Sequence, residues 1–293
     1  MDSSVWVWLT PTLMALVFWG LGQGFVKKYI SEVPPARFCL YFVVAKGIVN
    51  LWYFGTNEHL PPFAPEGMGF FLVALLAYVM DGIGWILYFQ SIVYGPISIV
   101  GTLSATYPAV TIVLARIFLA EMLTPPQYVG VSLVILSCLG LAYGPSDSES
   151  KKTHGRWIPL AVSAVLVWGV AWTIMKYAYS LPSADEANMA LFNTMGSFLT
   201  LGIYGLLYGR KGVHSFREWS VSFLPMGLMA AGDLSVIIAA KTGPVSIVAP
   251  LSGAYPVVTL GFAWMVLKER ITTFQWWCIA LLLVGMFLSP GAG

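Results

Sequence analysis

Continuous apolar runs dominate this chain, and they leave few options for its fold. Each run is about 20 residues long, the length of an α-helix that crosses the hydrocarbon core of a bilayer. Strands of an outer-membrane barrel would alternate polar and apolar residues, and these runs do not alternate. Charged residues make up 10% of the chain, too few to cover a water-facing surface. The sequence therefore predicts an all-α polytopic membrane protein.

Ten transmembrane helices are predicted, joined by short connections rich in Gly and Pro. The first run, preceded by "MDSSVWVW" without Lys or Arg, is expected to be a retained helix and not a cleaved signal peptide. The predicted spans are Val5–Val26, Ala36–Tyr53, Gly67–Ile92, Ile97–Leu119, Pro126–Tyr143, Trp157–Tyr177, Glu186–Tyr208, Trp219–Ala240, Val245–Leu267 and Thr273–Leu288.

The two halves of the chain are repeats of each other. The segment that starts at Gly95 recurs 148 positions later at Gly243, where 11 of 17 aligned residues are identical. The first helices match at an offset of 149, which pairs Trp19 with Trp168. We predict a first five-helix repeat over residues 1–144, a polar linker over 145–156 and a second five-helix repeat over 157–293.

An odd number of helices in each repeat determines how the two repeats are oriented. A five-helix unit enters the membrane on one side and leaves on the other, so the second copy must be inverted. Inverted repeats are a recurrent design of secondary transporters, with the substrate bound near the midplane. The alternative is a gene duplication that only builds a bundle.

A Ser-x-x-Tyr-Pro motif occurs at equivalent places in the two repeats. Pro108 and Pro256 cannot donate to the carbonyls of Ser104 and Ser252, so each is predicted to kink its helix and leave a free carbonyl at mid-membrane depth. Such a group is tolerated where it lines a wet cavity or is buried in protein. One interpretation makes these helices the walls of a central pocket; the other is a packing kink.

Three charged residues are predicted to lie inside the membrane: Lys46, Asp81 and Asp233. Such residues are costly and therefore functional candidates. Two interpretations remain open: the acids take up protons and couple transport to a proton gradient, or a fixed Lys–Asp ion pair holds helices together. Arg116, Glu121 and Glu269 are instead predicted to lie near helix ends and to extend to the interface.

Aromatic and uncharged polar side chains within the spans are further candidates for a binding site. Mid-helix aromatic rings could form a box for a cation or stack on an aromatic ligand, although core packing explains any single one. Asn50, Gln90 and Asn193 could bind substrate or bridge helices. The predicted substrate-binding residues are Trp19, Gln23, Tyr78, Asp81, Trp85, Tyr88, Ser104, Tyr107, Trp168, Trp172, Ser252 and Tyr255.

Other classes of function find little support. The net charge of +2 is small and gives no basis for nucleic-acid binding. Cys39, Cys138 and Cys278 lie in apolar runs and suggest neither a disulfide framework nor a metal site. A membrane-embedded enzyme would need a polar catalytic cluster, and the three histidines at positions 59, 154 and 214 are far apart in loops. A scaffold subunit is a third alternative.

Taken together, these motifs resemble the EamA branch of the drug/metabolite transporter superfamily. The resemblance rests on the two five-helix repeats, "FWG" and "VWG" in the first helices, Gly-Pro-x-Ser-Ile-Val before the Tyr-Pro motifs, and "LAEMLTPPQYVG" with "LKERITTFQWW". It implies a ten-helix basket around a central cavity walled by helices 1, 3, 4, 6, 8 and 9. It also implies transport of small polar metabolites, without fixing the substrate.

We therefore expect a secondary transporter that moves a small polar metabolite, an amino acid or amine, by alternating access. The alternative cargo is a choline-like quaternary ammonium compound or another drug-like cation. Protons are the candidate coupling ion; no cofactor or metal is expected. Lys and Arg are concentrated in the loops of one side, which predicts that both termini lie outside the plasma membrane, in bacteria the inner membrane. A monomer or a homodimer fits the resemblance.

Overall fold

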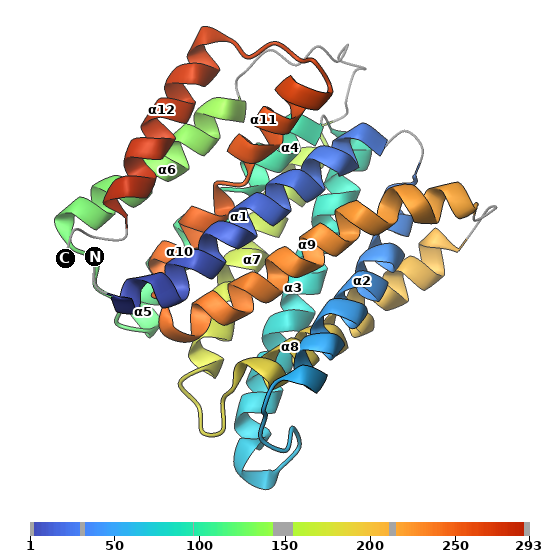
Figure 1. Ribbon diagram of the computed structural model, residues 1–293, viewed down its shortest axis with the longest axis vertical. Coiled ribbons are helices and arrows are strands. Elements are labelled where there is room, and N and C mark those ends of the chain that lie inside the picture. Colours follow the sequence, from blue (N-terminus) through green and yellow to red (C-terminus); the bar gives the residue numbers. More distant parts are fainter. Residues whose placement is uncertain (1–2, 30–32, 96, 143–154, 211–214, 290–293) are drawn as a thin grey trace.

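The fold is a bundle of helices, seen here in a computed structural model that describes residues 3–29, 33–95, 97–142, 155–210 and 215–289 (Figure 1). Within these ranges every regular element is helical. The elements are α1 (Ser3–Tyr29), α2 (Pro35–Thr56), η1 (Pro65–Gly67), α3 (Met68–Tyr94), α4 (Ile97–Ser104), α5 (Tyr107–Phe118), α6 (Pro125–Ala142), α7 (Trp157–Ala178), α8 (Glu186–Ser197), η2 (Phe198–Gly202), η3 (Gly205–Gly209), α9 (Phe216–Thr242), α10 (Val245–Gly253), α11 (Pro256–Val266) and α12 (Thr273–Leu288).

Length and hydropathy separate the helices into two groups. Among the described residues, six helical stretches are long and apolar enough to cross a membrane: 4–29, 36–56, 65–94, 157–178, 216–242 and 245–266. The apolar stretches 107–118, 125–141 and 273–288 are shorter. The architecture is that of a multi-pass membrane protein, although helix length alone does not give ten crossings.

Proline divides two of the predicted spans. The span predicted over 97–119 consists of α4 and α5, and the span predicted over 245–267 consists of α10 and α11. Pro108 and Pro256 lie in the first turn of α5 and α11. Because proline lacks an amide donor and crowds the carbonyl four residues back, it is tolerated where a helix starts and kinks or breaks a helix in its interior.

The span predicted over 186–208 is also not a plain α-helix. α8 ends at Ser197 and continues into two π-helical turns, η2 and η3. π-turns are rare and are frequent at functional sites. Here the first of them begins directly after Ser197, which contacts Lys46.

α1 and α7, the first helices of the two halves, run antiparallel at the centre of the molecule. Near the start of α1, a Cβ on Gly243 would lie 2.9 Å from the Cβ of Trp8. Lys176, in the last turn of α7, donates to the carbonyl of that same Gly243 at 2.8 Å. At the opposite end, Trp157 of α7 packs against Gly95. α6 and α12 lie side by side at one edge of the bundle, away from this centre (Figure 1).

Two glycines let these central helices approach their neighbours closely, and they carry a stability prediction. A Cβ on Gly169 would lie 2.5 Å from Val110 of α5, and a Cβ on Gly20 would overlap Val258 of α11. We expect Gly169→Ala and Gly20→Ala each to destabilise the protein by about 1–3 kcal/mol, because the packed partner must shift. A Cβ on Gly47 would meet no neighbouring atom within 4 Å, so Gly47→Ala is the control. Thermal unfolding in detergent would contradict this prediction if all three variants melted alike.

Candidate substrate site

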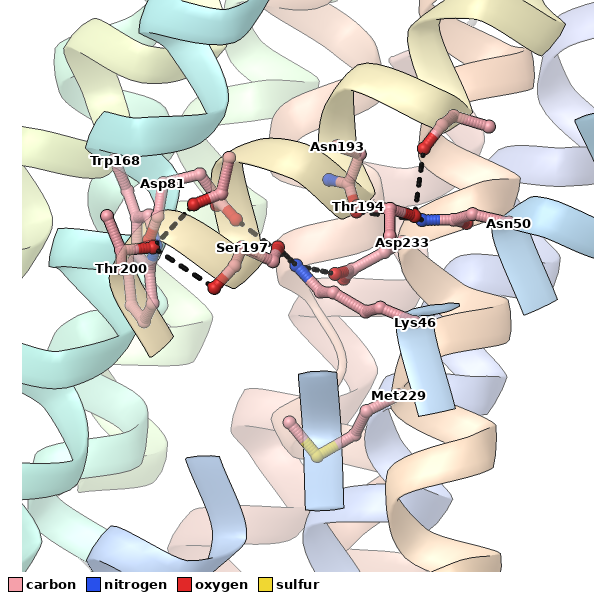
Figure 2. A network of polar contacts seen from close by, with 12 residues as sticks. Lys46, Asn50, Asp81, Trp168, Asn193, Thr194, Ser197, Thr200, Met229 and Asp233 are labelled. Atoms are coloured by element: carbon pink, nitrogen blue, oxygen red, sulfur yellow. Dashed lines mark hydrogen bonds and ion pairs between the residues drawn. The ribbon is translucent and has the colours of Figure 1, made fainter. Parts of the chain in front are cut away.

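Three charged side chains meet inside the bundle: Lys46 and Asp233 are buried, and Asp81 is partly buried (Figure 2). Lys46 of α2 is fully buried, and its Nζ lies 2.7 Å from Asp233 Oδ2 of α9 and 3.5 Å from Asp81 Oδ2 of α3. The three side chains come from three helices of both halves of the chain. Counted as ionised groups they carry one positive and two negative charges. The cluster therefore has one negative charge in excess.

The two carboxylates are held differently. Asp233 has a second partner, because Trp19 Nε1 donates to its Oδ1 at 2.9 Å. Asp81 is the more distant partner of Lys46. Since the attraction between opposite charges weakens with distance, Asp233 is the anchor of the lysine and Asp81 is the more loosely held carboxylate.

Polar side chains of α8 complete the surroundings of Lys46 (Figure 2). Lys46 Nζ donates to Ser197 Oγ at 3.1 Å. One turn earlier, Asn193 Oδ1 accepts from Asn50 Nδ2 at 2.9 Å, and Thr194 Oγ1 accepts from the same nitrogen at 3.2 Å. These bonds tie α2 to α8 beside the cluster.

The two tryptophans duplicated by the repeat occupy equivalent positions around the cluster. Trp19 Nε1 donates to the carbonyl of Met229, and Trp168 Nε1 donates to the carbonyl of Asp81, each at 3.2 Å. Met229 follows Asp81 by 148 positions, which is the repeat offset. Each indole also lies against a glycine of the facing helix, Gly232 or Gly84. The repeat thus places one indole on each side of the charges.

Further rings extend this arrangement into an aromatic wall. The ring centroids of Trp19 and Trp172 are 6.0 Å apart, and those of Tyr107 and Trp172 are 5.0 Å apart. Trp168 lies 5.0 Å from Trp85 and 6.0 Å from Tyr107. The faces of such rings attract cations and the edges of other rings.

Two small cavities adjoin at the charged cluster and share Trp19, Asp81, Trp172 and Asp233 as walls. One extends to Tyr78 and Asn193 and the other to Gln23 and Tyr107. Each has a volume of about 30 Å³, enough for about two water molecules. A metabolite would need the cavity to widen.

The structure brings most of the predicted site residues to these cavities. Asp81, Asp233 and Lys46 meet directly. The predicted substrate-binding residues that line the cavities are Trp19, Gln23, Tyr78, Asp81, Trp85, Tyr107, Trp168, Trp172 and Tyr255. Tyr88 is placed behind this wall, where its hydroxyl donates to Gln23 Oε1 at 3.1 Å.

Ser104 and Ser252 are placed differently from the predicted substrate-binding residues that line the cavities. Both are fully buried, and neither is among the residues that line the two cavities. The free carbonyl predicted at Ser252 is wrong, because that carbonyl accepts the amide of Tyr255 at 3.2 Å. The turn that follows α10 tightens and re-uses the carbonyl that proline leaves without its usual donor. The Ser252 hydroxyl donates to the carbonyl of Val248 at 2.7 Å.

Sequence reasoning did not single out Ser197, and it left the role of Asn193 open. A signal was present: residues 193, 197 and 200 are polar and spaced at i, i+4 and i+7. This spacing places them on one face of a helix. In the described part of the chain no group of three or more His, Cys, Asp or Glu residues is placed to hold a metal ion. His154 and His214 lie outside the described residues.

Comparison with known proteins identifies the family. The model of the EamA-like transporter family matches residues 6–143 and 155–289. An uncharacterized protein from Methanocaldococcus jannaschii is 38% identical over 136 residues, which are 44% of this chain and 92% of the relative. A solved crystal structure, described only as that of a protein, matches with a TM-score of 0.74 and 16% identity over 96% of this chain and 95% of its own.

The likeness to this solved structure shows the fold, and the match to the family model shows the protein family. The match spans both halves of a helical, multi-pass membrane chain whose centre holds a charged, aromatic site. The protein belongs to the EamA-like transporter family, part of the drug/metabolite transporter superfamily.

Proposed function

We propose that this chain is a secondary transporter that moves a small amine-bearing metabolite, an amino acid or an amine, by alternating access. The excess negative charge of the Lys46–Asp81–Asp233 cluster carries this proposal. An uncompensated charge is costly in a buried site. A proton or the ammonium group of a substrate would neutralise this excess charge. The site would then hold a proton in one part of the transport cycle and the substrate ammonium in the other.

The unequal hold on the two carboxylates assigns them different roles. Asp233 keeps Lys46 in place, since it has the closest contact to the ammonium and is fixed by Trp19. Asp81 is the carboxylate that receives the proton or the substrate ammonium. In this assignment Lys46 is bound closely by Asp233, while Asp81 stays available to a proton or a substrate. It differs in this from the fixed Lys–Asp ion pair that the sequence also allowed.

The aromatic wall supports a second candidate cargo, a choline-like quaternary ammonium compound. Indole and phenol faces attract cations that cannot donate hydrogen bonds. Trp19, Trp172 and Tyr107 form one continuous set of ring contacts beside Asp81 and Asp233. Such a cargo would depend on the rings more than on a hydrogen bond to Asp81.

Alternating access requires two equivalent sides, and we propose that residues 1–144 and 157–293 are inverted five-helix repeats that together cross the membrane ten times. The antiparallel course of α1 and α7 supports this, as do the equivalent bonds of Trp19 and Trp168. The half-length relative, matched over 92% of its own chain, also fits a repeat that is a unit of the fold. We place the protein in the plasma membrane, the inner membrane of a bacterium.

Flux measurements on purified protein in liposomes test the proposal. A pH gradient is expected to drive accumulation of a small amine or amino acid above the concentration outside, and empty liposomes are the control. Competition by choline separates the two cargoes: it should inhibit strongly only if the aromatic wall selects the cargo. No flux or counterflow for any amine, amino acid or quaternary ammonium compound would contradict the proposed function.

A further inference from the structure

The two cavities beside the cluster present negative charge to a cargo. Among the described residues that line them, the charged ones are Asp81 and Asp233. Lys46 contacts both carboxylates, but it is fully buried and is not among the lining residues. A cargo that enters either cavity therefore meets carboxylates in its wall and no ammonium.

The net charge of the cargo decides whether the cluster becomes balanced. Lys46, Asp81 and Asp233 together carry one negative charge in excess when all three are ionised. A cargo with a single positive charge brings the sum to zero. A zwitterion, such as an amino acid at neutral pH, leaves the excess in place and adds a third carboxylate beside the other two. Like charges repel strongly away from water, so the cavities favour an amine that has no carboxylate.

One of the cavities also contains a buried hydroxyl that has no hydrogen-bond partner in the described part of the chain. Tyr78 lines the cavity that extends to Asn193, is 4% exposed, and its Oη is unpaired. Tyr78 lies three residues before Asp81 on α3, so the two side chains share a helix face. An unpaired buried hydroxyl is costly, and a cargo that widens the cavity would give it a partner.

The repeat shows that packing does not require this hydroxyl. The position equivalent to Tyr78, 148 residues later on α9, is occupied by Met226, which is fully buried. An apolar side chain therefore fills the same place in the second half of the chain. The hydroxyl of Tyr78 is a feature of one repeat only, as expected for a group that binds a cargo.

Asn193 supplies a second polar group in the wall of the same cavity. Asn50 Nδ2 donates to its Oδ1 at 2.9 Å, and the amide nitrogen of Asn193 points away from Asn50 (Figure 2). An amide nitrogen only donates, whereas a tyrosine hydroxyl can donate or accept. Together, Tyr78 and Asn193 suit a neutral group that accepts a hydrogen bond, such as a hydroxyl.

We propose that the cargo is a cation with a neutral hydrogen-bonding group next to its ammonium, as in an amino alcohol, and that Tyr78 determines this specificity. The ammonium binds Asp81, while the neutral group binds Tyr78 and Asn193. The proposal rests on the proposed function and narrows its cargo. A simple amine offers no partner to Tyr78, an amino acid adds a carboxylate, and a quaternary ammonium compound has no N–H group for Asp81.

Two sets of compounds that differ at the carbon beside the ammonium test the class of cargo. Phenylalaninol, phenylalanine and phenethylamine carry a hydroxymethyl group, a carboxylate and a hydrogen there, and share a phenyl ring for the rings of Trp19 and Trp172. Alaninol, alanine and ethylamine form the smaller set. Calorimetry on the purified protein in detergent at neutral pH gives their dissociation constants. In at least one set, we expect the amino alcohol to bind about tenfold more tightly than either analogue.

Tyr78→Phe removes the hydroxyl alone and should separate binding from stability. We expect the affinity for the amino alcohol to fall by about tenfold, with no change for the simple amine. The melting temperature should not fall, because the hydroxyl has no partner to lose. Tyr179→Phe is the matched control: the Tyr179 hydroxyl donates to the carbonyl of Ile237 at 2.8 Å. This control should lower the melting temperature and keep the preference for the amino alcohol.

Several results would overturn the proposal: an amino acid that binds as tightly as its amino alcohol, no binding of either amino alcohol, or equal weakening of a whole set by Tyr78→Phe. Flux of the same compounds into liposomes is measured with the unchanged protein. Flux of an amino acid or a simple amine without flux of the amino alcohols overturns this specificity and leaves the transporter standing. No flux of any compound contradicts both.

Discussion

Replacing Lys46 by Met is expected to cost about 3–5 kcal/mol of stability, the usual effect of removing one partner from a buried ion pair. Lys46 is fully buried and is the shared cation of Asp81 and Asp233. Methionine fills a similar volume but leaves two carboxylates facing each other with no positive charge. Thermal unfolding in detergent should show the loss, and flux should fall to the level of empty liposomes.

A matched control distinguishes the loss of a buried lysine charge from the loss of a lysine charge at the surface. Lys28, in the last turn of α1, is exposed and lies over the ring of Tyr29. Lys28→Met removes the same charge from the surface and should change stability by less than about 1 kcal/mol. A second variant, Lys46→Met with Asp233→Asn, should recover part of the lost stability because it removes one of the two unpaired carboxylates. Equal melting temperatures for Lys46→Met and Lys28→Met would contradict the buried-cation interpretation.

The class of the protein and the meeting of its intramembrane charges were predictable because the bilayer and the repeat constrain them strongly. A charged side chain within a membrane-spanning run faces the interior of the bundle and pairs with another charge there. Lys46, Asp81 and Asp233 could therefore be named as partners. The repeat offset identified Trp19 and Trp168 as an equivalent pair. Both inferences depend on sequence position alone.

Contacts that depend on the path of the backbone were not predictable in the same way. Proline predicts that a hydrogen bond is lost, but it does not say whether the next turn will re-use the carbonyl, as Tyr255 does with Ser252. Glu121 and Glu269 were expected to extend to the interface because they follow apolar runs. Their partners lie 124 to 242 positions away along the chain, and only the fold brings them together.

The two carboxylates provide the sharpest test of how the site works, because Asp81→Asn and Asp233→Asn should fail in different ways. Asp81→Asn leaves Lys46 paired with Asp233 at the shorter contact, so the melting temperature should change little. The excess negative charge is gone, however. We expect accumulation driven by a pH gradient to disappear and the affinity for an amine to fall by about tenfold or more.

Asp233→Asn should instead damage the structure. It removes the closest partner of Lys46 and one acceptor of Trp19, and the ammonium then has only Asp81 to balance it. We expect a loss of about 3 kcal/mol or more in stability. Flux should also be lost, because Lys46 would then occupy Asp81, the carboxylate that substrate or proton would use. Undiminished proton-driven accumulation in both variants would rule out coupling through this cluster. A larger stability loss for Asp81→Asn than for Asp233→Asn would reverse the roles assigned to the two acids.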